Sequence, residues 1–461
     1  MKDLAALAEV LAGRLGPGAV VTGADAAGRL VGWAQPVPLG TSLLVRPATT
    51  EEVLATVIAC REAGVGVVPL GGGTGLVGGA VGGPDVVALS LERLDRVLEV
   101  DADDRVLIAE AGVTLETAQR AAAAEGLDLG LDLGARSTAQ LGGLVATNAG
   151  GNGVIRHGMT RHRVLGLEVV LADGTVLAGL RRIVKDNTGY DLAGLFCGSE
   201  GTLGVVTAVA LRCSPTPAGR VTALVAVPGF DETVSLLRSL QARTAGAVAA
   251  FEVMWRSFYE LVAVESGHHQ PPLPADHPLY VLTEVEVGEP AGATEWFAGL
   301  VAELAAEGAV ADAVVAHTAG DRAALWAIRD DIPALVDALG GRLAYDVSLP
   351  IAAMPGYLEQ LGDALAARHR GSRLVVFGHL GDGNLHVTIG GPPEDAAADI
   401  DRLVYEPLAE LGGSISAEHG IGRHKRPHLA RSRSPEEIAT MRAIKQALDP
   451  TGILNPGALF E

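Results

Sequence analysis

Cysteine and aromatic residues are scarce in this chain of 461 residues. Phe, Trp and Tyr together make up 4% of the sequence, and three cysteines are present. Cys60, Cys197 and Cys213 match neither a disulfide framework nor a CxxC metal site. We therefore expect a reducing compartment, of which the cytoplasm is the simplest.

Positive charge and long apolar runs are also lacking. The 35 Lys and Arg residues against 55 Asp and Glu residues give a net charge of −20. Because nucleic acids and anionic membranes attract basic surfaces, this balance argues against both as partners. No segment offers the roughly 18 uninterrupted apolar residues of a transmembrane helix. Asp3 and Glu9 interrupt what would have to be the apolar core of a signal peptide.

The length and the apolar pattern predict more than one domain. From about residue 42 to 212 short strands alternate with helices, and prolines at 215 and 217 mark a boundary. From about 220 to 415 the pattern predicts an antiparallel sheet with helices on one side, and a polar, helical tail follows. The fold class expected is therefore α+β.

Two local patterns in the first region are specific. Residues 49–64 have helical periodicity and open with Thr49 and Glu52 at the spacing of a capping box. Residues 165–179 have two strand-like halves around Asp173-Gly174. The first pattern predicts a helix with a reciprocal cap, and the second predicts a hairpin.

The stretch VPLGGGTGLVGGA, residues 68–80, contains the spacing GxGxxG. This spacing indicates a Rossmann dinucleotide site only where a helix begins at the loop. Here glycines and a proline continue to residue 84 and an apolar strand follows, which excludes that site. Consecutive glycine amides between two strands still favour a phosphate-binding nest over a flexible surface loop.

Two more glycine-rich stretches, residues 131–158 and 196–207, carry Ser, Thr or Asn among their glycines. Three such loops in one domain exceed what structure alone requires. Together they suit a long ligand that has a pyrophosphate and a flat ring system.

The stretch HLGDGNLH, residues 379–386, has a histidine at each end and Gly-Asp-Gly between them. If it turns at Asp382-Gly383, His379 and His386 lie opposite each other, at a Cβ separation of about 4.5–5.5 Å on one face. That separation suits two ligands of one metal ion. Two solvated histidines on a surface hairpin are the equal alternative from these residues alone.

The most specific signal is a set of motifs spread over nearly the whole chain: PLGGGTGLVGGA, QLGGLVATNAGG, KDNTGYDLAGLFCGSEGTLGVVT, FGHLGDGNLH, EHGIGRHK and DPTGILNPG. In combination they resemble the FAD-dependent D-2-hydroxy acid dehydrogenases, a branch of the vanillyl-alcohol oxidase type flavoenzymes. This branch contains D-lactate dehydrogenase, D-2-hydroxyglutarate dehydrogenase and the glycolate oxidase D subunit. The resemblance implies a two-part FAD-binding domain, formed by residues 1–215 and a C-terminal segment, 416–461, that returns to the flavin. An antiparallel-sheet substrate cap, 216–415, would lie between them.

The resemblance also implies which residues bind FAD. Covalent flavin attachment through the first loop uses a histidine there, and this loop has none, so non-covalent FAD is expected. The residues carried over belong to the first loop, to the second glycine-rich stretch, to the third stretch and to the tail: Pro69, Gly71, Gly72, Gly73, Thr74, Gly75 and Leu76; Ser137, Gly142, Gly143, Thr147, Asn148 and Gly151; Glu200, Gly201, Gly204 and Val206; and Asn455.

For the substrate side, the resemblance implies a divalent metal, zinc or manganese, held by His379, His386 and Glu418. His419 would be the general base. Two further residues would lie near the substrate. Arg329 would clamp the substrate carboxylate, although its spacing to the two following aspartates alone suggests a solvated ion pair. Asn384 would reach the flavin or a metal-bound water, with an ordinary turn asparagine nearly as good an interpretation.

The chain departs from D-2-hydroxyglutarate dehydrogenases at two positions that serve the distal carboxylate. Ala344 stands in place of a lysine, and Thr388 in place of an asparagine. We therefore expect a D-2-hydroxy acid with a small or apolar side chain, such as D-lactate. Arg342 would substitute for the lysine only if the strand keeps its register.

The expected partners are the 2-hydroxy acid and an electron acceptor, either electron-transfer flavoprotein or a quinone, together with a homodimer contact. Two other functions fit part of the pattern. A metal-dependent hydrolase would use the histidines and Glu418 without flavin chemistry. An ether-lipid synthase relative would share the flavin fold but has no need of the metal residues.

Overall fold

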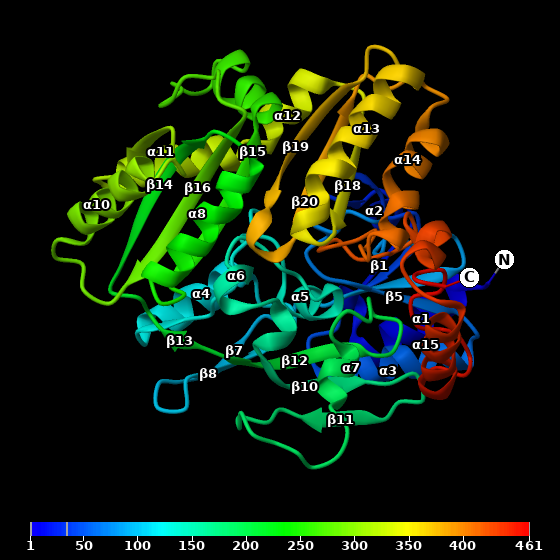
Figure 1. The fold of residues 1–461 in the computed structure, drawn as a ribbon. Coiled ribbons are helices and arrows are strands. Elements are labelled where there is room, and N and C mark those ends of the chain that lie inside the picture. The colour runs from blue at the N-terminus through cyan, green and yellow to red at the C-terminus, as the bar shows by residue number, and fades with distance from the viewer. Residues whose placement is uncertain (1, 34–35, 461) are drawn as a thin grey trace. The chain divides into compact units, whose positions relative to one another are not determined.

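A computed structural model describes residues 2–33 and 36–460, which form two compact units (Figure 1). The first unit comprises Met1–Gly151, Gly158–Thr216 and Glu418–Glu461, and the second comprises Asn152–His157 and Pro217–Ala417. The second unit therefore includes a short piece that lies within the sequence of the first.

The first unit contains a four-stranded sheet of order β1-β4-β6-β5. The β1–β4 pair is antiparallel, and β6 runs parallel to both β4 and β5. The elements of this region are α1 (Leu4–Leu15), η1 (Pro17–Ala19), β1 (Val20–Thr22), α2 (Ala24–Ala27), β2 (Leu30–Val31), β3 (Val37–Pro38), β4 (Leu43–Val45), α3 (Thr50–Glu62), β5 (Gly66–Leu70) and β6 (Val86–Ser90).

The predicted helix after residue 49 is confirmed as α3, but its reciprocal cap is wrong. The Thr49 hydroxyl accepts a hydrogen bond from the amide of Glu52, at 3.2 Å. The Glu52 carboxylate accepts from the amide of Ala48, at 2.7 Å, one residue before the position a capping box uses. The carboxylate therefore secures the chain just before the helix.

A second sheet of the first unit is antiparallel throughout, in the order β11-β10-β12-β8-β7. Its β10–β11 pair confirms the predicted hairpin, with Gly174 at a φ of +93° in the turn. The elements here are β7 (Val97–Asp101), β8 (Val106–Glu110), α4 (Leu115–Ala124), β9 (Leu127–Asp128), α5 (Leu141–Thr147), η2 (Thr160–His162), β10 (Val164–Val170), β11 (Val176–Gly179), α7 (Leu192–Phe196), β12 (Val205–Arg212) and β13 (Ser214–Pro215).

The end of the chain joins the first unit through the four-stranded sheet. After η6 (Arg426–Arg431) and α15 (Pro435–Leu448), Leu454 forms a parallel bridge with Val67 of β5. Ile453 and Leu454 are buried in the core cluster of this unit. The tail thereby brings Asn455 beside β5, where its backbone amide donates to the Val67 carbonyl at 2.7 Å.

The second unit is built on one seven-stranded antiparallel sheet of order β17-β14-β16-β15-β19-β20-β18. Its strands are β14 (Gly219–Val227), β15 (Val248–Trp255), β16 (Leu279–Val287), β17 (Asp312–Val315), β18 (Arg342–Ser348), β19 (Arg373–His379) and β20 (Asn384–Gly390). Its helices are α6 (Val154–His157), α8 (Phe230–Arg243), α9 (Arg256–Tyr259), η3 (Glu260–Glu265), α10 (Ala293–Ala306), α11 (Ala319–Asp330), α12 (Ile332–Leu339), η4 (Ile351–Ala353), α13 (Met354–Arg368), η5 (Leu380–Asp382) and α14 (Ala397–Glu410).

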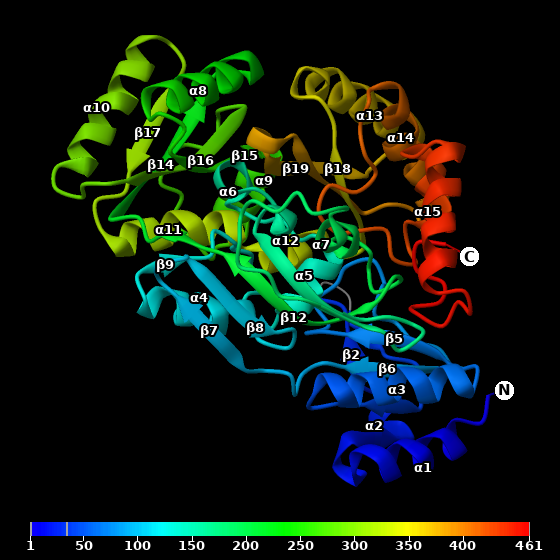
Figure 2. The same ribbon diagram turned by 90° about the horizontal axis from the view of Figure 1, so that it is seen from below.

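The predicted antiparallel sheet is confirmed, but the prediction that helices cover one side is wrong. Leu224 and Ala226 of β14 share a core cluster with Leu325 of α11 and Leu335 of α12. Side chains alternate along a strand, so the intervening β14 residues point to the other face. There α8 and α10 cover the sheet (Figure 2). Helical periodicity in the sequence does not say which face of a sheet a helix covers.

Among the residues that the structure describes, we find no helix long and apolar enough to cross a membrane.

Candidate active site

The glycine loop follows β5 in the first unit, and residues 71–85 contain no helix, which confirms that it is not a Rossmann loop. A Cβ atom at Gly72 would lie 1.9 Å from the carbonyl oxygen of Thr138. Only glycine permits this approach, so the loop lies directly against the segment that carries the predicted flavin residue Ser137. Ser137 itself is exposed.

Three predicted flavin residues adopt left-handed backbone conformations. The φ angles are +49° at Asn148, +53° at Glu200 and +41° at Asn455. The Asn455 amide donates to the carbonyl oxygens of Gly79 and Glu200, at 3.0 and 2.8 Å. These two hydrogen bonds connect the tail to both the first and the third glycine-rich stretch. Non-glycine residues with left-handed backbone angles are strained, and such residues gather at binding sites.

The buried carboxylate of Glu200 links the third stretch to the EHGIG motif. It accepts hydrogen bonds from the amides of Ile421 and Gly422, at 2.8 and 2.7 Å. Burial raises the pKa of this carboxyl group, against the opposing effect of the two amides and of Lys425. Glu200 thus shapes the site by binding backbone groups.

Two buried acceptors in this region have no partner within the described chain. They are Oε1 of Gln140 and Oδ1 of Asn455. A Cβ atom at Gly71 would lie 3.6 Å from that Gln140 oxygen, which places it beside the glycine loop. A buried acceptor without a donor is costly, so both positions fit a polar ligand such as FAD.

The other predicted flavin residues fall into four groups. Gly73, Thr74, Gly75 and Leu76 continue the first loop, and Gly142, Gly143 and Thr147 belong to α5, where Thr147 donates to the Gly143 carbonyl. Pro69 of β5 packs against Gly201, and Gly151 lies against the Asp132 carbonyl. Gly204 and Val206 pack inside the core, where a Cβ at Gly204 would lie 2.4 Å from Val169. Close packing in the core therefore explains why residue 204 is a glycine.

In the second unit, the predicted register of the histidine hairpin is wrong. His386 lies opposite Phe377, and His379 lies opposite Glu252 of the neighbouring strand β15. The reason is the turn, a 3-10 segment closed by Gly383 at a φ of +83°, in place of a two-residue turn. The histidines are diagonal neighbours on one face, with ring centroids 5.3 Å apart and planes at 81°.

His379 and Arg329 share one buried carboxylate, that of Glu252. Oε1 of Glu252 lies 2.7 Å from Nδ1 of His379, and Oε2 accepts from Nε of Arg329 at 2.8 Å. Arg329 is 5% exposed and its guanidinium lies over the Phe377 ring, so the solvated ion pair is excluded. The contacts with His379 and Arg329 hold the pKa of Glu252 below its usual value, although burial acts in the opposite direction.

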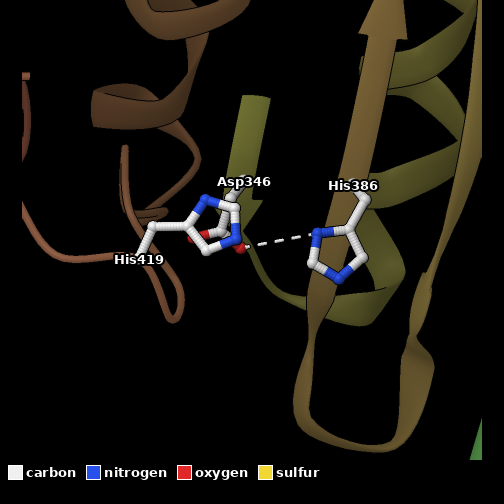
Figure 3. A group of neighbouring side chains, drawn as sticks. All are labelled: Asp346, His386 and His419. Carbon is white, nitrogen blue, oxygen red and sulfur yellow. Dashed lines mark ion pairs between the residues drawn. The ribbon is translucent and has the colours of Figure 1, made fainter. Parts of the chain in front are cut away.

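A second buried carboxylate, Asp346 of β18, lies opposite His386 (Figure 3). Its Oδ1 is 3.7 Å from Nδ1 of His386 and accepts from the Asn384 amide at 2.7 Å. Its Oδ2 accepts from the amide of Ala417, at 3.1 Å. Since a carboxylate only accepts, the Asn384 amide nitrogen must face it. Oδ1 of Asn384 is then buried without a partner in the described chain.

Glu418 and His419 follow Ala417 directly in the chain. Consecutive Cα atoms are about 3.8 Å apart, so the Ala417–Asp346 hydrogen bond fixes the point from which these two residues start. In the first unit, one Glu418 oxygen accepts from the amide of Gly151, at 2.8 Å.

Sequence reasoning missed Glu252 and Asp346. Each is an acidic residue between two buried neighbours of its strand, in the segments FEV (251–253) and YDV (345–347). An unpaired charge is rarely buried, so these two positions are the signal that could have identified them.

Two family models match the chain. The model described as FAD binding domain matches residues 41–179, and the model described as FAD linked oxidases, C-terminal domain, matches residues 216–459. The second match covers more than half of the chain.

The chain is also similar to curated proteins and to a solved structure. The mitochondrial D-2-hydroxyglutarate dehydrogenase of Bos taurus is 38% identical over 457 residues, which are 98% of this chain and 82% of that protein. A putative mitochondrial D-lactate dehydrogenase of Schizosaccharomyces pombe is 36% identical over 90% of this chain and 81% of that protein. The structure of an alkyldihydroxyacetonephosphate synthase has a TM-score of 0.76 at 17% identity, and the match covers 98% of this chain and 84% of the synthase chain. The last likeness shows the fold alone.

Proposed function

Because this chain belongs to the family of FAD-dependent D-2-hydroxy acid dehydrogenases, we propose that it oxidises a D-2-hydroxy acid with a small or apolar side chain. D-Lactate is the example we favour. The single observation that carries the proposal is the buried group formed by Arg329, Glu252 and His379. An arginine held beside a metal-binding imidazole suits a substrate that has a carboxylate next to a hydroxyl.

We propose that His379, His386 and Glu418 hold a divalent metal, zinc or manganese. The donor set fits, because two imidazoles and one carboxylate leave coordination positions open for substrate. The two imidazoles converge on one sheet face, and carboxylates lie beside the Nδ1 atom of each. A metal bound there would supply a Lewis acid that lowers the pKa of the substrate hydroxyl.

The protein residues divide the remaining work. Arg329 binds the substrate carboxylate, and His419 takes the proton of the C2 hydroxyl as general base. Asn384 offers its buried oxygen as an acceptor that helps to orient the substrate or a water. FAD, when bound, supplies the acceptor at N5 for the hydride that leaves C2. The product is the 2-oxo acid.

The sheet face beyond the histidines supports a small side chain. Ala344 and Thr388 are paired across β18 and β20, one position along from the Asp346–His386 pair on that face. Neither residue carries a charge, so a distal carboxylate of the substrate would meet no cation there.

D-2-Hydroxyglutarate is the second candidate, because of Arg342. The β18–β20 pairing runs without a bulge from Arg342 to Ser348. Arg342 therefore shares the sheet face of Ala344 and Asp346. This is the face on which it must lie to bind the distal carboxylate of D-2-hydroxyglutarate. The name of the bovine relative supports this candidate, and that of the fission-yeast relative supports D-lactate.

We further propose electron-transfer flavoprotein or a quinone as electron acceptor, and a homodimer; both rest on the family resemblance. A hydrolase, by contrast, has no use for the FAD domain.

The test is anaerobic bleaching of the bound flavin by a panel of D- and L-2-hydroxy acids. We expect rapid bleaching by D-lactate and none by L-lactate. A flavin that no 2-hydroxy acid reduces would overturn the proposed function.

A further inference from the structure

Glu252 occupies a position that no motif identifies, and the proposed function gives this carboxylate no role of its own. It lies in the middle of β15, is 1% exposed, and has a carboxylate with one oxygen toward His379 and the other toward Arg329. These two partners come from β19 and α11, which are distant in sequence. One side chain therefore contacts both a proposed metal ligand and the proposed carboxylate clamp.

The hydrogen bonds fix the tautomer of His379. Nδ1 faces a carboxylate oxygen, which only accepts, so Nδ1 carries the hydrogen. Nε2 lies 3.5 Å from Nη2 of Arg329, which only donates, so Nε2 presents its lone pair. This is the tautomer that binds a metal through Nε2, and a carboxylate on the opposite nitrogen increases the basicity of that ligand.

We propose that Glu252 is a positioning residue for both halves of the substrate site. It holds His379 as an Nε2 ligand and, through its second oxygen, fixes the Arg329 guanidinium at the place where the substrate carboxylate binds. The inference rests on the proposed function and deepens it, because it makes metal affinity and substrate binding depend on one carboxylate.

A matched control is present on the same sheet face. Glu284 of β16 is 4% exposed and accepts hydrogen bonds from Nε and Nη2 of Arg322, at 2.6 and 2.9 Å. Arg322 and Arg329 both belong to α11. Glu284 also accepts from Thr222 and Trp326, and none of these partners is a histidine. Both glutamates thus bind an arginine of α11, but only Glu252 of the two also contacts a proposed metal ligand, His379.

The experiment compares Glu252→Gln with Glu284→Gln in the FAD-loaded protein. An amide in place of the Glu252 carboxylate must turn its NH2 group toward either His379 or Arg329, so one of the two contacts becomes unfavourable. We expect the zinc dissociation constant, measured by competition with a chromophoric chelator, to rise roughly 10- to 100-fold in Glu252→Gln. Glu284→Gln should lower the unfolding temperature but leave zinc affinity unchanged.

A second measurement tests the shared role. At saturating zinc, Glu252→Gln should still show a raised KM for D-lactate, by about tenfold, with a smaller change in kcat, because Arg329 has lost its fixed position. If Glu252→Gln does not fold, Glu252→Asp is measured in its place and should show the same two effects in smaller size.

Three results would overturn the inference. Equal zinc affinity in the wild type and Glu252→Gln would remove the metal half, and a normal KM at saturating zinc would remove the substrate half. An equal loss of zinc affinity in Glu284→Gln would reduce both effects to general destabilisation. Failure of the wild type itself to bind zinc is a different outcome, because it refutes the proposed metal site before Glu252 is considered.

Discussion

Asp346 lies directly opposite His386 in the β18–β20 pair and also accepts a hydrogen bond from the amide of Ala417. A single buried carboxylate therefore joins a proposed metal ligand, the Asn384 side chain and the chain segment that leads into Glu418 and His419. Replacement by an isosteric amide should expose this role.

We predict that Asp346→Asn destabilises the protein and lowers kcat/KM. The new NH2 group must face either the Asn384 amide or the Ala417 amide, each a donor, at a cost of about 1–3 kcal/mol. Chemical denaturation measures the first effect and steady-state kinetics the second. A variant with unchanged stability and unchanged kcat/KM would show that the carboxylate has no such role.

We predict that FAD is released when the purified protein is precipitated with acid. The glycine loop contains no histidine for covalent attachment. The supernatant should contain the flavin, as its absorbance spectrum would show. Yellow colour retained in the washed pellet would refute non-covalent binding.

We predict that His419→Gln slows flavin reduction by about 100-fold or more, the usual contribution of a positioned general base. The apparent affinity for D-lactate should change much less, because Arg329 and the proposed metal ligands are intact. Stopped-flow reduction at several substrate concentrations separates the two quantities. Normal reduction with weakened binding would instead make His419 a binding residue.

The choice between the two candidate substrates depends on Arg342. We predict that kcat/KM favours D-lactate over D-2-hydroxyglutarate and that Arg342→Ala leaves the D-lactate value unchanged. If the wild type prefers D-2-hydroxyglutarate by more than about tenfold, or roughly 1.4 kcal/mol, and Arg342→Ala abolishes that preference, Arg342 is the distal cation. The same acceptor must be used in both assays.

Patterns within short stretches predicted much of the fold, including α3, the hairpin at Gly174 and the helix-free glycine loop. The register of the histidine hairpin failed because a 3-10 turn replaced the expected tight turn. The burial of Arg329 could not be predicted locally, since its partner Glu252 is 77 residues away. The spacing of residues within a short stretch gives no information about contacts between segments that are far apart in the sequence. The pairing of Asp346 with His386 could not be predicted for the same reason.

The most direct test of a metal- and FAD-dependent dehydrogenase is the rate of anaerobic flavin reduction by D-lactate in metal-loaded, chelator-stripped and reloaded enzyme. The histidines proposed to bind the metal belong to the second unit and the predicted flavin residues to the first, so stripping should leave the flavin content unchanged. We predict that reduction becomes at least about 100-fold slower on stripping and recovers on reloading. His386→Ala should behave like the stripped enzyme and should not recover. Reduction at the original rate after complete removal of the metal would contradict the account.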